Sequence, residues 1–244
     1  MGDHGVLTGD SARARSIRAM FGRIARRYDL MNAVITFGRD RAWRRAAAAA
    51  AAVPPAGRVL DVATGTGVLA EEVLRRAPRA AVIGIDFAMP MIRAGMAARR
   101  APRLRWCLAD ALVLPFPDDC FDAVLSAFLL RNAGSLEHAI EEQTRVVKPG
   151  GRVVCLESSP RRPGPLRPAA RWYMHRVMPL AAALLAGDAP AYRYLAESTA
   201  AFLPPESLAQ ALERAGLRLL SIRTFMAGTV ALHTAVKPGE APRP

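Results

Sequence analysis

The chain has 244 residues, 52% of them hydrophobic, and carries a net charge of +13. This length suits one α/β domain with additions, and no apolar run reaches the roughly 18–20 residues that cross a bilayer as a helix. Its three cysteines lack the spacing of metal ligands or a redox pair, and no signal peptide opens the chain, so we expect a cytoplasmic protein without a metal site.

The N-terminal segment is basic and amphipathic. Residues 1–14 are polar and unpatterned, so we expect a flexible terminus there. Apolar residues then recur at helical spacing from Ile17 to Ile24, and arginines occupy the other faces. The alanine-rich run 43–52 also has the composition of a helix. Residues 15–53 are therefore predicted to form a helical lid.

Short apolar runs alternate with helical patterns in the central part of the chain. Alternation of this kind predicts a parallel sheet with right-handed crossovers. The unit is expected to span 56–158, with a polar loop at 111–120 and a turn at 148–151. The expected strands are 58–62, 80–86, 104–110, 121–128 and 152–158, and the expected helices are 68–77, 88–100 and 135–147.

The C-terminal part departs from this alternation. Its proline-rich start excludes a regular element over 160–168, and we expect a mostly helical insertion over 160–203. A final helix and an antiparallel hairpin are expected over 204–237, and a loose tail over 238–244. Residues 15–237 are thus predicted to form a single domain. The expected hairpin strands are 217–225 and 228–237.

A glycine turn joins the first strand to its helix. Gly65 and Gly67 allow the backbone, rather than side chains, to meet a ligand. Together with Ala70 they match the dinucleotide fingerprint, and Asp86 lies about 20 residues further on, where an acid that binds ribose belongs. Taken alone, this pattern favours a nicotinamide-dependent dehydrogenase.

Three acids favour a different cofactor. Asp61 precedes the glycines, and a carboxylate there repels pyrophosphate but attracts an ammonium group. Asp86 and Asp110 end the next two strands, where they suit ribose hydroxyls and an adenine amino group. An amino-acid end, a ribose and an adenine together describe S-adenosylmethionine.

A closing strand antiparallel to six parallel ones is, by analogy, the usual plan of class I methyltransferases. The predicted fold is therefore α/β, with a seven-stranded, mostly parallel, doubly wound Rossmann-like sheet. Its last strand is antiparallel, a helical extension precedes it, and a helical insertion follows the fifth strand.

Six sequence blocks carry a resemblance to a known family: YDLMNAVITFGRDRAWRR, LDVATGTG, ADALVLPFPDDCFDAV, RVVKPGGRVVCLE, YRYLAESTAAF and GTVALH. In order and spacing they resemble the ubiquinone/menaquinone biosynthesis C-methyltransferases (the UbiE/MenG type), from about Phe21 to Lys237. The resemblance implies methyl transfer from S-adenosylmethionine to a ring carbon of a polyprenylated quinol, such as demethylmenaquinol or a ubiquinol precursor. A paralogue acting on another phenolic or polyketide-like ring is the alternative.

The expected cofactor contacts combine the residue pattern with this resemblance. The resemblance implies contacts at Thr66, Asp86 and the Asp110–Ala111 pair, and Tyr28 is expected to lie over the cofactor. The full set of expected cofactor residues is Asp61, Gly65, Thr66, Gly67, Asp86, Asp110, Ala111 and Tyr28.

Ring methylation also needs a group that stabilises phenolate or a base for the quinol. Arg131, with Asn132 beside it, is the first candidate for stabilisation, and His233 is a candidate base. The alternatives are that Arg131 pairs with Glu157 and that His233 is structural. Tyr192 and Tyr194 are candidates for the wall of the substrate pocket, and we expect at most one of them to line it, because residues two apart on a helix point in different directions.

The isoprenoid tail of such a quinol would lie in the bilayer. Two arginine-rich segments, 11–45 and 158–180, and the apolar run 177–186 suit shallow attachment to anionic lipid at the inner face of the membrane. A solvated basic face and an ordinary core helix are the alternative. The cofactor motifs disfavour the further alternative of a non-catalytic protein that binds RNA or lipid. We expect a lipophilic quinol and a transient membrane surface as partners. We expect no nucleic acid, and a homodimer is compatible with the sequence.

Overall fold

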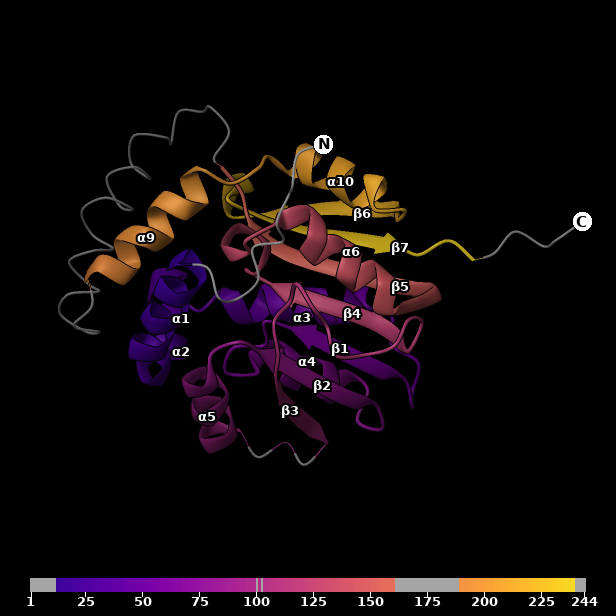
Figure 1. Ribbon diagram of the computed structural model, residues 1–244, viewed down its shortest axis with the longest axis horizontal. Helices are drawn as coiled ribbons and strands as arrows, with labels where there is room; N and C mark the ends of the chain where they lie inside the picture. Colours follow the sequence, from indigo (N-terminus) through magenta and orange to yellow (C-terminus); the bar gives the residue numbers. More distant parts are fainter. Residues whose placement is uncertain (1–11, 100, 102, 161–188, 240–244) are drawn as a thin grey trace, which may run out of the picture.

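Seven strands form one sheet in the computed structural model, which describes residues 12–99, 101, 103–160 and 189–239 (Figure 1). The strands are β1 (Arg58–Val62), β2 (Ala81–Asp86), β3 (Leu104–Leu108), β4 (Phe121–Ala127), β5 (Val147–Ser158), β6 (Arg218–Phe225) and β7 (Val230–Val236). Their order is β3-β2-β1-β4-β5-β7-β6, and β1 to β5 are parallel. β7 runs antiparallel to both neighbours, which confirms the predicted fold class.

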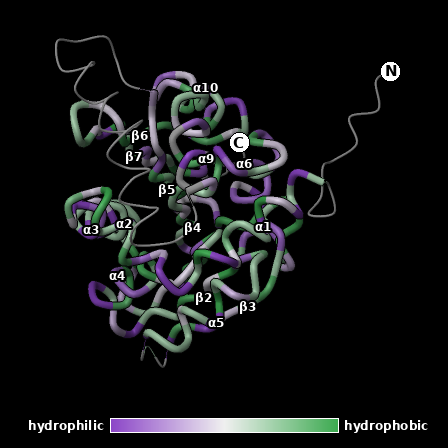
Figure 2. The backbone as a smooth tube through the Cα atoms, turned by 90° about the vertical axis from the view of Figure 1, so that its left-hand side faces the viewer, coloured by the Kyte–Doolittle hydropathy of each residue, from purple (hydrophilic) through white to green (hydrophobic). Residues whose placement is uncertain are grey.

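Helices cover both faces of this sheet. They are α1 (Ala12–Ile24), α2 (Tyr28–Ile35), α3 (Asp40–Ala50), α4 (Val68–Arg76), α5 (Met89–Ala98), α6 (Leu136–Val146), α9 (Ala189–Ala200) and α10 (Pro205–Arg214). Short 3-10 helices accompany them in the described residues: η1 (Ala25–Arg27), η2 (Leu130–Asn132) and η4 (Met226–Gly228). One core contains buried residues of α3 and α4, and the other contains buried residues of α6 and α10. Hydrophobic and hydrophilic residues alternate along α4, as expected of a helix with one face on a sheet (Figure 2).

The helices α1, α2 and α9 lie together on one side of the sheet (Figure 1). Met20, Met31 and Ala191 form a small core between them. Phe21 and Tyr28 reach from this group to a second cluster that includes Ala88, directly after β2. The first two helices of the predicted lid therefore pack beside the carboxyl ends of the parallel strands, whereas α3, which the prediction included, packs with α4 on one face of the sheet.

Several predicted boundaries were wrong by a few residues. α1 already begins at Ala12, inside the segment expected to be flexible. The turn expected at 148–151 is an irregularity within β5, because the strand begins at Val147 and its register against β4 shifts there. The hairpin strands are joined by η4, in which Met226 and Ala227 have positive φ angles.

Part of the predicted insertion lies outside the described residues. This applies to the proline-rich stretch from 161 onward, to the apolar run 177–186 and to most of the second arginine-rich segment. No helix of the described chain is both long and apolar enough to span a bilayer.

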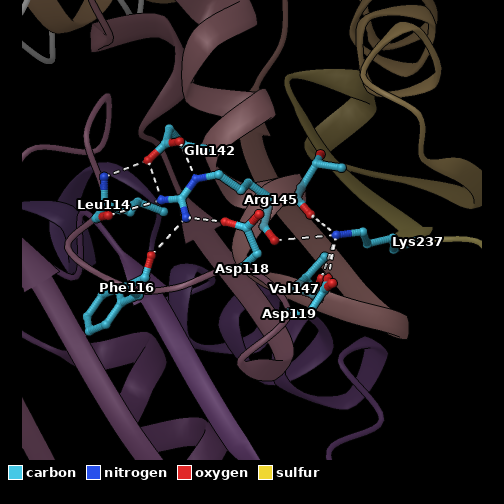
Figure 3. A network of polar contacts seen from close by, with 9 residues as sticks. Leu114, Phe116, Asp118, Asp119, Glu142, Arg145, Val147 and Lys237 are labelled. Carbon is cyan, nitrogen blue, oxygen red and sulfur yellow. Dashed lines mark hydrogen bonds and ion pairs between the residues drawn. The ribbon is translucent and has the colours of Figure 1, made fainter.

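Arg145, at the end of α6, anchors the loop between β3 and β4 (Figure 3). Its guanidinium donates to the Glu142 carboxylate at 2.6 and 2.9 Å and to Asp118 at 2.8 Å. It also donates to the carbonyl oxygens of Leu114 and Phe116 at 3.0 and 2.8 Å. Because three donors of one rigid group meet acceptors in this loop and two more are held by Glu142 of α6, Arg145 fixes the loop that begins at Asp110.

Replacing Arg145 with Ala should lower the free energy of unfolding by about 2–3 kcal/mol, because several charge-assisted hydrogen bonds are lost together. Urea titration followed by circular dichroism measures this value. Arg79→Ala, at an exposed arginine, is the control and should change stability by less than about 0.5 kcal/mol. Equal effects of the two substitutions would show that the loop does not depend on Arg145.

Candidate active site

A cavity lies at the carboxyl ends of β1, β2 and β4, under α1 and α2. One side of it is formed by the glycine turn and by the loops after β2 and β3, and the other by α1, α2 and the segment after β4. Among its lining residues are Arg13, Ile17, Phe21, Tyr28, Gly65, Asp86, Phe87, Met91, Asp110, Ala111, Leu112, Phe128, Leu129 and Asn132. Five of the predicted cofactor residues, Tyr28, Gly65, Asp86, Asp110 and Ala111, therefore border one cavity.

The two glycines of the turn serve different purposes. Gly65 has a φ of +60°, and a Cβ atom there would lie 3.3 Å from Met91 and 4.0 Å from the Tyr28 ring, on the cavity side. Gly67 has a φ of +82°, and a Cβ atom there would lie 2.5 Å from the Trp106 ring. Gly65 thus leaves space for a ligand, whereas Gly67 does not border the cavity and allows close packing on β3.

Asp86 ends β2 and joins it to the glycine turn. Its carboxylate accepts the backbone N–H of Gly65 at 2.9 Å and that of Ala88 at 2.8 Å. Burial raises the pKa of Asp86 to about 6, although these hydrogen bonds oppose the shift. Asp110 faces the same cavity, and its Oδ1 accepts the N–H of Leu112 at 3.0 Å.

Asp61 lies behind the turn and does not border the cavity. Its Oδ2 accepts from the Thr64 hydroxyl at 2.6 Å and from the N–H of Ala70 at 3.1 Å. Its Oδ1 is buried and has no hydrogen-bond partner among the described residues. Burial raises the pKa of Asp61 to about 7. A buried carboxylate oxygen without a donor fits the ammonium end of S-adenosylmethionine, reached directly or through water.

Thr66 does not border the cavity either. Its hydroxyl donates to the Asp29 carboxylate of α2 at 2.5 Å. The second oxygen of Asp29 accepts from Arg99 at 2.5 Å. The cofactor contact that the resemblance implied for Thr66 stays a prediction, and its hydroxyl is engaged elsewhere.

The segment after β4 supplies the opposite wall. Phe128 has a φ of +60°, an uncommon conformation for a bulky residue. Its ring lies between two guanidinium groups, with Arg131 at 5.1 Å and Arg44 at 5.6 Å from the ring centroid. Its carbonyl oxygen accepts from the Asn132 amide at 2.9 Å. These contacts hold a strained backbone at the edge of the cavity.

Arg131 is placed behind this wall, not in it. Its guanidinium lies 3.4 Å from Glu157 and donates to the Ser158 hydroxyl at 3.3 Å. Glu157 is buried, and its other oxygen accepts the N–H of Leu130 at 2.6 Å. Burial raises the pKa of Glu157 to about 7, against the opposing charge of Arg131. The pairing stated as the alternative from sequence is the one observed, and Arg131 does not border the cavity.

His233 is also remote from the cavity. It lies in the middle of β7, opposite Cys155, and is fully buried. Its Nε2–H donates to the carbonyl oxygen of Pro205 at the start of α10, at 2.8 Å. Burial lowers the pKa of His233 and so favours the neutral ring. The expectation of a quinol base at His233 is corrected, because this placement is that of a structural residue that joins α10 to the sheet.

Asn132 borders the cavity and connects it to α9. Its amide oxygen accepts from the Tyr194 hydroxyl at 3.0 Å. Tyr194 therefore acts through Asn132 and is not itself among the lining residues. Sequence reasoning missed Asp29 and Phe128, because neither an ion pair across helices nor a left-handed phenylalanine leaves a local pattern.

The sheet order, the glycine turn and the acids after β2 and β3 define a class I S-adenosylmethionine-dependent methyltransferase. A solved SAM-dependent methyltransferase from Thermotoga maritima shares this fold, with a TM-score of 0.62, 18% identity, and coverage of 91% of this chain and 99% of that one.

The chain belongs to the ubiE/COQ5 methyltransferase family, whose model matches residues 9–237. A demethylmenaquinone methyltransferase of Thermus thermophilus is 45% identical over 90% of this chain and 100% of the relative. A demethylmenaquinone methyltransferase of Roseiflexus castenholzii is 42% identical over 96% of this chain and 98% of the relative. The protein is thus an S-adenosylmethionine-dependent methyltransferase, and the dehydrogenase interpretation is set aside.

Cofactor affinity and folding stability should respond to pH in opposite directions. The pKa values of Asp86 and Asp61 lie at about 6 and about 7, above the ordinary value of 3.8. Protonation therefore favours the folded apoprotein, and stability falls as pH rises through these values. Ribose and ammonium groups need the ionised acids, so the dissociation constant should rise about tenfold per pH unit between about 7 and about 6, and more steeply below about 6, where both acids must lose a proton.

Calorimetric titration with S-adenosylmethionine between about pH 5 and pH 8 measures this dependence. Asp86→Asn should weaken binding at pH 8 and should make the dissociation constant depend less steeply on pH below about 6. An affinity that is independent of pH in the natural protein would contradict the assignment of Asp86 to the ribose.

Proposed function

We propose that the protein methylates a ring carbon of a polyprenylated quinol, with demethylmenaquinol as the first candidate. The observation that carries the proposal is the composition of the cavity. Next to the acids that suit the cofactor, its wall continues over apolar side chains of α1 and of the segment after β4, including Ile17, Phe21 and Leu129. An aromatic ring with an apolar tail fits such a wall, and the names of the relatives indicate the same substrate class.

The cofactor, when bound, supplies an electrophilic methyl group on a sulfonium sulfur. The protein must align the ring with this group and favour the phenolate, because an ortho phenolate makes the ring carbon nucleophilic. Asn132 is the polar residue best placed for this role. One hydrogen of its amide binds the carbonyl oxygen of Phe128, and the amide has a second hydrogen to offer a quinol oxygen.

Arg131 contributes from behind the wall in this proposal. It orients Phe128 and adds positive charge near the phenolate, but it does not touch the ring of the substrate. Tyr28 lies above Gly65, where it covers the cofactor half of the cavity. No part in the chemistry is proposed for His233.

Incubation with labelled S-adenosylmethionine tests the substrate class. The acceptors are short-tailed demethylmenaquinol, a ubiquinol precursor and a simple phenol. We expect label in demethylmenaquinol and little in the phenol. Transfer to the phenol alone would replace the proposal by the paralogue hypothesis, and no transfer by folded, cofactor-binding protein would reject both.

Asn132→Ala should lower kcat by about 10²-fold while cofactor affinity changes little, because a donor aimed at a developing oxyanion is lost. Steady-state kinetics with the labelled methyl donor measures both values. His233→Asn is the matched control and should reduce thermal stability without reducing kcat of the folded protein. A loss of kcat at His233 as large as that at Asn132 would contradict this assignment.

The outer face of α2, together with the turn that follows it, is proposed to rest on an anionic membrane surface. Leu30 of α2 and Phe37 of the turn are 58% and 69% exposed. The exposed arginines Arg26, Arg27 and Arg39 flank them. The opposite face of α2 carries Tyr28, which borders the cavity, so this orientation would bring the site close to a lipid-borne tail.

Leu30→Ser together with Phe37→Ser should weaken binding to phosphatidylglycerol vesicles about tenfold, because two apolar side chains no longer enter the interface. Vesicle sedimentation measures binding without any reaction. Leu220→Ser, at a leucine of β6 that is 45% exposed, is the control and should leave binding unchanged. Equal losses in both variants would show that α2 is not the contact surface.

A further inference from the structure

We infer that Asp29 is a positioning residue that holds the lid helix α2 against the glycine turn, and thereby holds Tyr28 over the cofactor. The inference rests on the cofactor assignment and not on the identity of the quinol. Asp29 is the second residue of α2, directly after Tyr28. It does not border the cavity, so its effect on the reaction is indirect.

The contacts of Asp29 join three separate parts of the chain. One carboxylate oxygen accepts from the hydroxyl of Thr66, which lies between the two glycines of the turn. The other accepts from Arg99, immediately after α5. An ionised carboxylate at the first turn of α2 also interacts favourably with the helix dipole.

Arg99 is largely buried and depends on Asp29 for its charge partner. Its guanidinium side chain is 12% exposed, and its only other carboxylate neighbour among the described residues is Glu71 of α4, at 3.5 Å. Its Nε atom is buried without a hydrogen-bond partner in the described structure. Loss of the Asp29 carboxylate would leave this cation poorly compensated, so α2 would lose its polar attachment at the turn.

The turn to which α2 is attached is the turn that faces the cofactor. Thr66 follows Gly65, whose Cβ position lies 4.0 Å from the Tyr28 ring. Cofactor bound against Gly65 orders Thr66, and Thr66 in turn orders Asp29 and the start of α2. Occupancy of the cofactor site is therefore coupled to the position of the lid.

The coupling is measured by hydrogen exchange of the α2 amides with and without S-adenosylhomocysteine. In the natural protein the ligand should slow exchange in α2 as well as in the glycine turn. In Asp29→Asn and Thr66→Val the protection should persist in the turn and disappear in α2. The dissociation constant should rise about three- to tenfold, because the charge-assisted contact between Asp29 and Thr66 is weakened in each variant. The KM for S-adenosylmethionine should rise more than kcat falls.

Two further variants and a double variant separate positioning from general damage. Thr66→Ser keeps the hydroxyl and should behave as the natural protein. Glu141→Gln alters an exposed carboxylate of α6 that pairs with His138, and it should change neither exchange nor affinity. The double variant should lose no more affinity than Asp29→Asn alone, because that substitution already weakens the one contact that Thr66→Val removes.

Unchanged α2 protection in Asp29→Asn, or fully additive losses in the double variant, would overturn the inference. Absence of any ligand binding by the natural protein would instead reject the cofactor assignment. In that case the faster α2 exchange of the unliganded Asp29→Asn variant would still report on the contact itself.

Discussion

The hydrogen bond from the Gly65 backbone to the Asp86 carboxylate is the contact on which the site depends. It joins the turn after β1 to the end of β2, and a second bond, from the N–H of Thr64 to the carbonyl oxygen of Ile85 at 2.7 Å, supports it. Asp86 is buried, and its donors in the described part of the chain are backbone N–H groups. Its ionised form is therefore incompletely compensated, and burial raises its pKa. This unfavourable free energy of the buried carboxylate arises at the position where ribose hydroxyls can donate further hydrogen bonds to it. Asp61 repeats the arrangement one strand away, with a carboxylate oxygen that has no donor among the residues that the structure describes.

A second constraint shapes the wall opposite the acids. Phe128 adopts a left-handed conformation at the end of β4, and two arginines lie beside its ring. Each arginine is held by a buried acid, Arg44 by Asp40 at 2.7 Å and Arg131 by Glu157. Buried ion pairs of this kind contribute more to a defined geometry than to stability. They place charge behind the cavity, while its surface toward a substrate stays mostly apolar.

The sheet, the glycine turn and the acids after β2 and β3 could be predicted because each follows from short-range pattern. Strand alternation, glycine spacing and the rule that ligands bind at the carboxyl ends of parallel strands need no knowledge of tertiary contacts. The orientation of Arg131 and His233 could not be predicted, because it depends on which buried group each side chain meets. The same holds for Thr66, whose hydroxyl binds a residue 37 positions earlier in the chain. The residues of the turn expected at 148–151 leave the pairing of β5 with β4, which passes from Val147 to Arg152, but they lie within a strand that begins before them, and this extension depends on a tertiary pairing.

Calorimetric titration with S-adenosylhomocysteine and, in parallel, with NAD separates the two cofactors that the glycine turn admits. Three acids around one turn favour an ammonium, a ribose and an adenine, and disfavour a pyrophosphate. We therefore predict that one molecule of S-adenosylhomocysteine binds per chain, that Asp86→Asn weakens this binding, and that NAD does not bind. Binding of NAD in the same cavity, with no binding of S-adenosylhomocysteine, would contradict the assignment of the site.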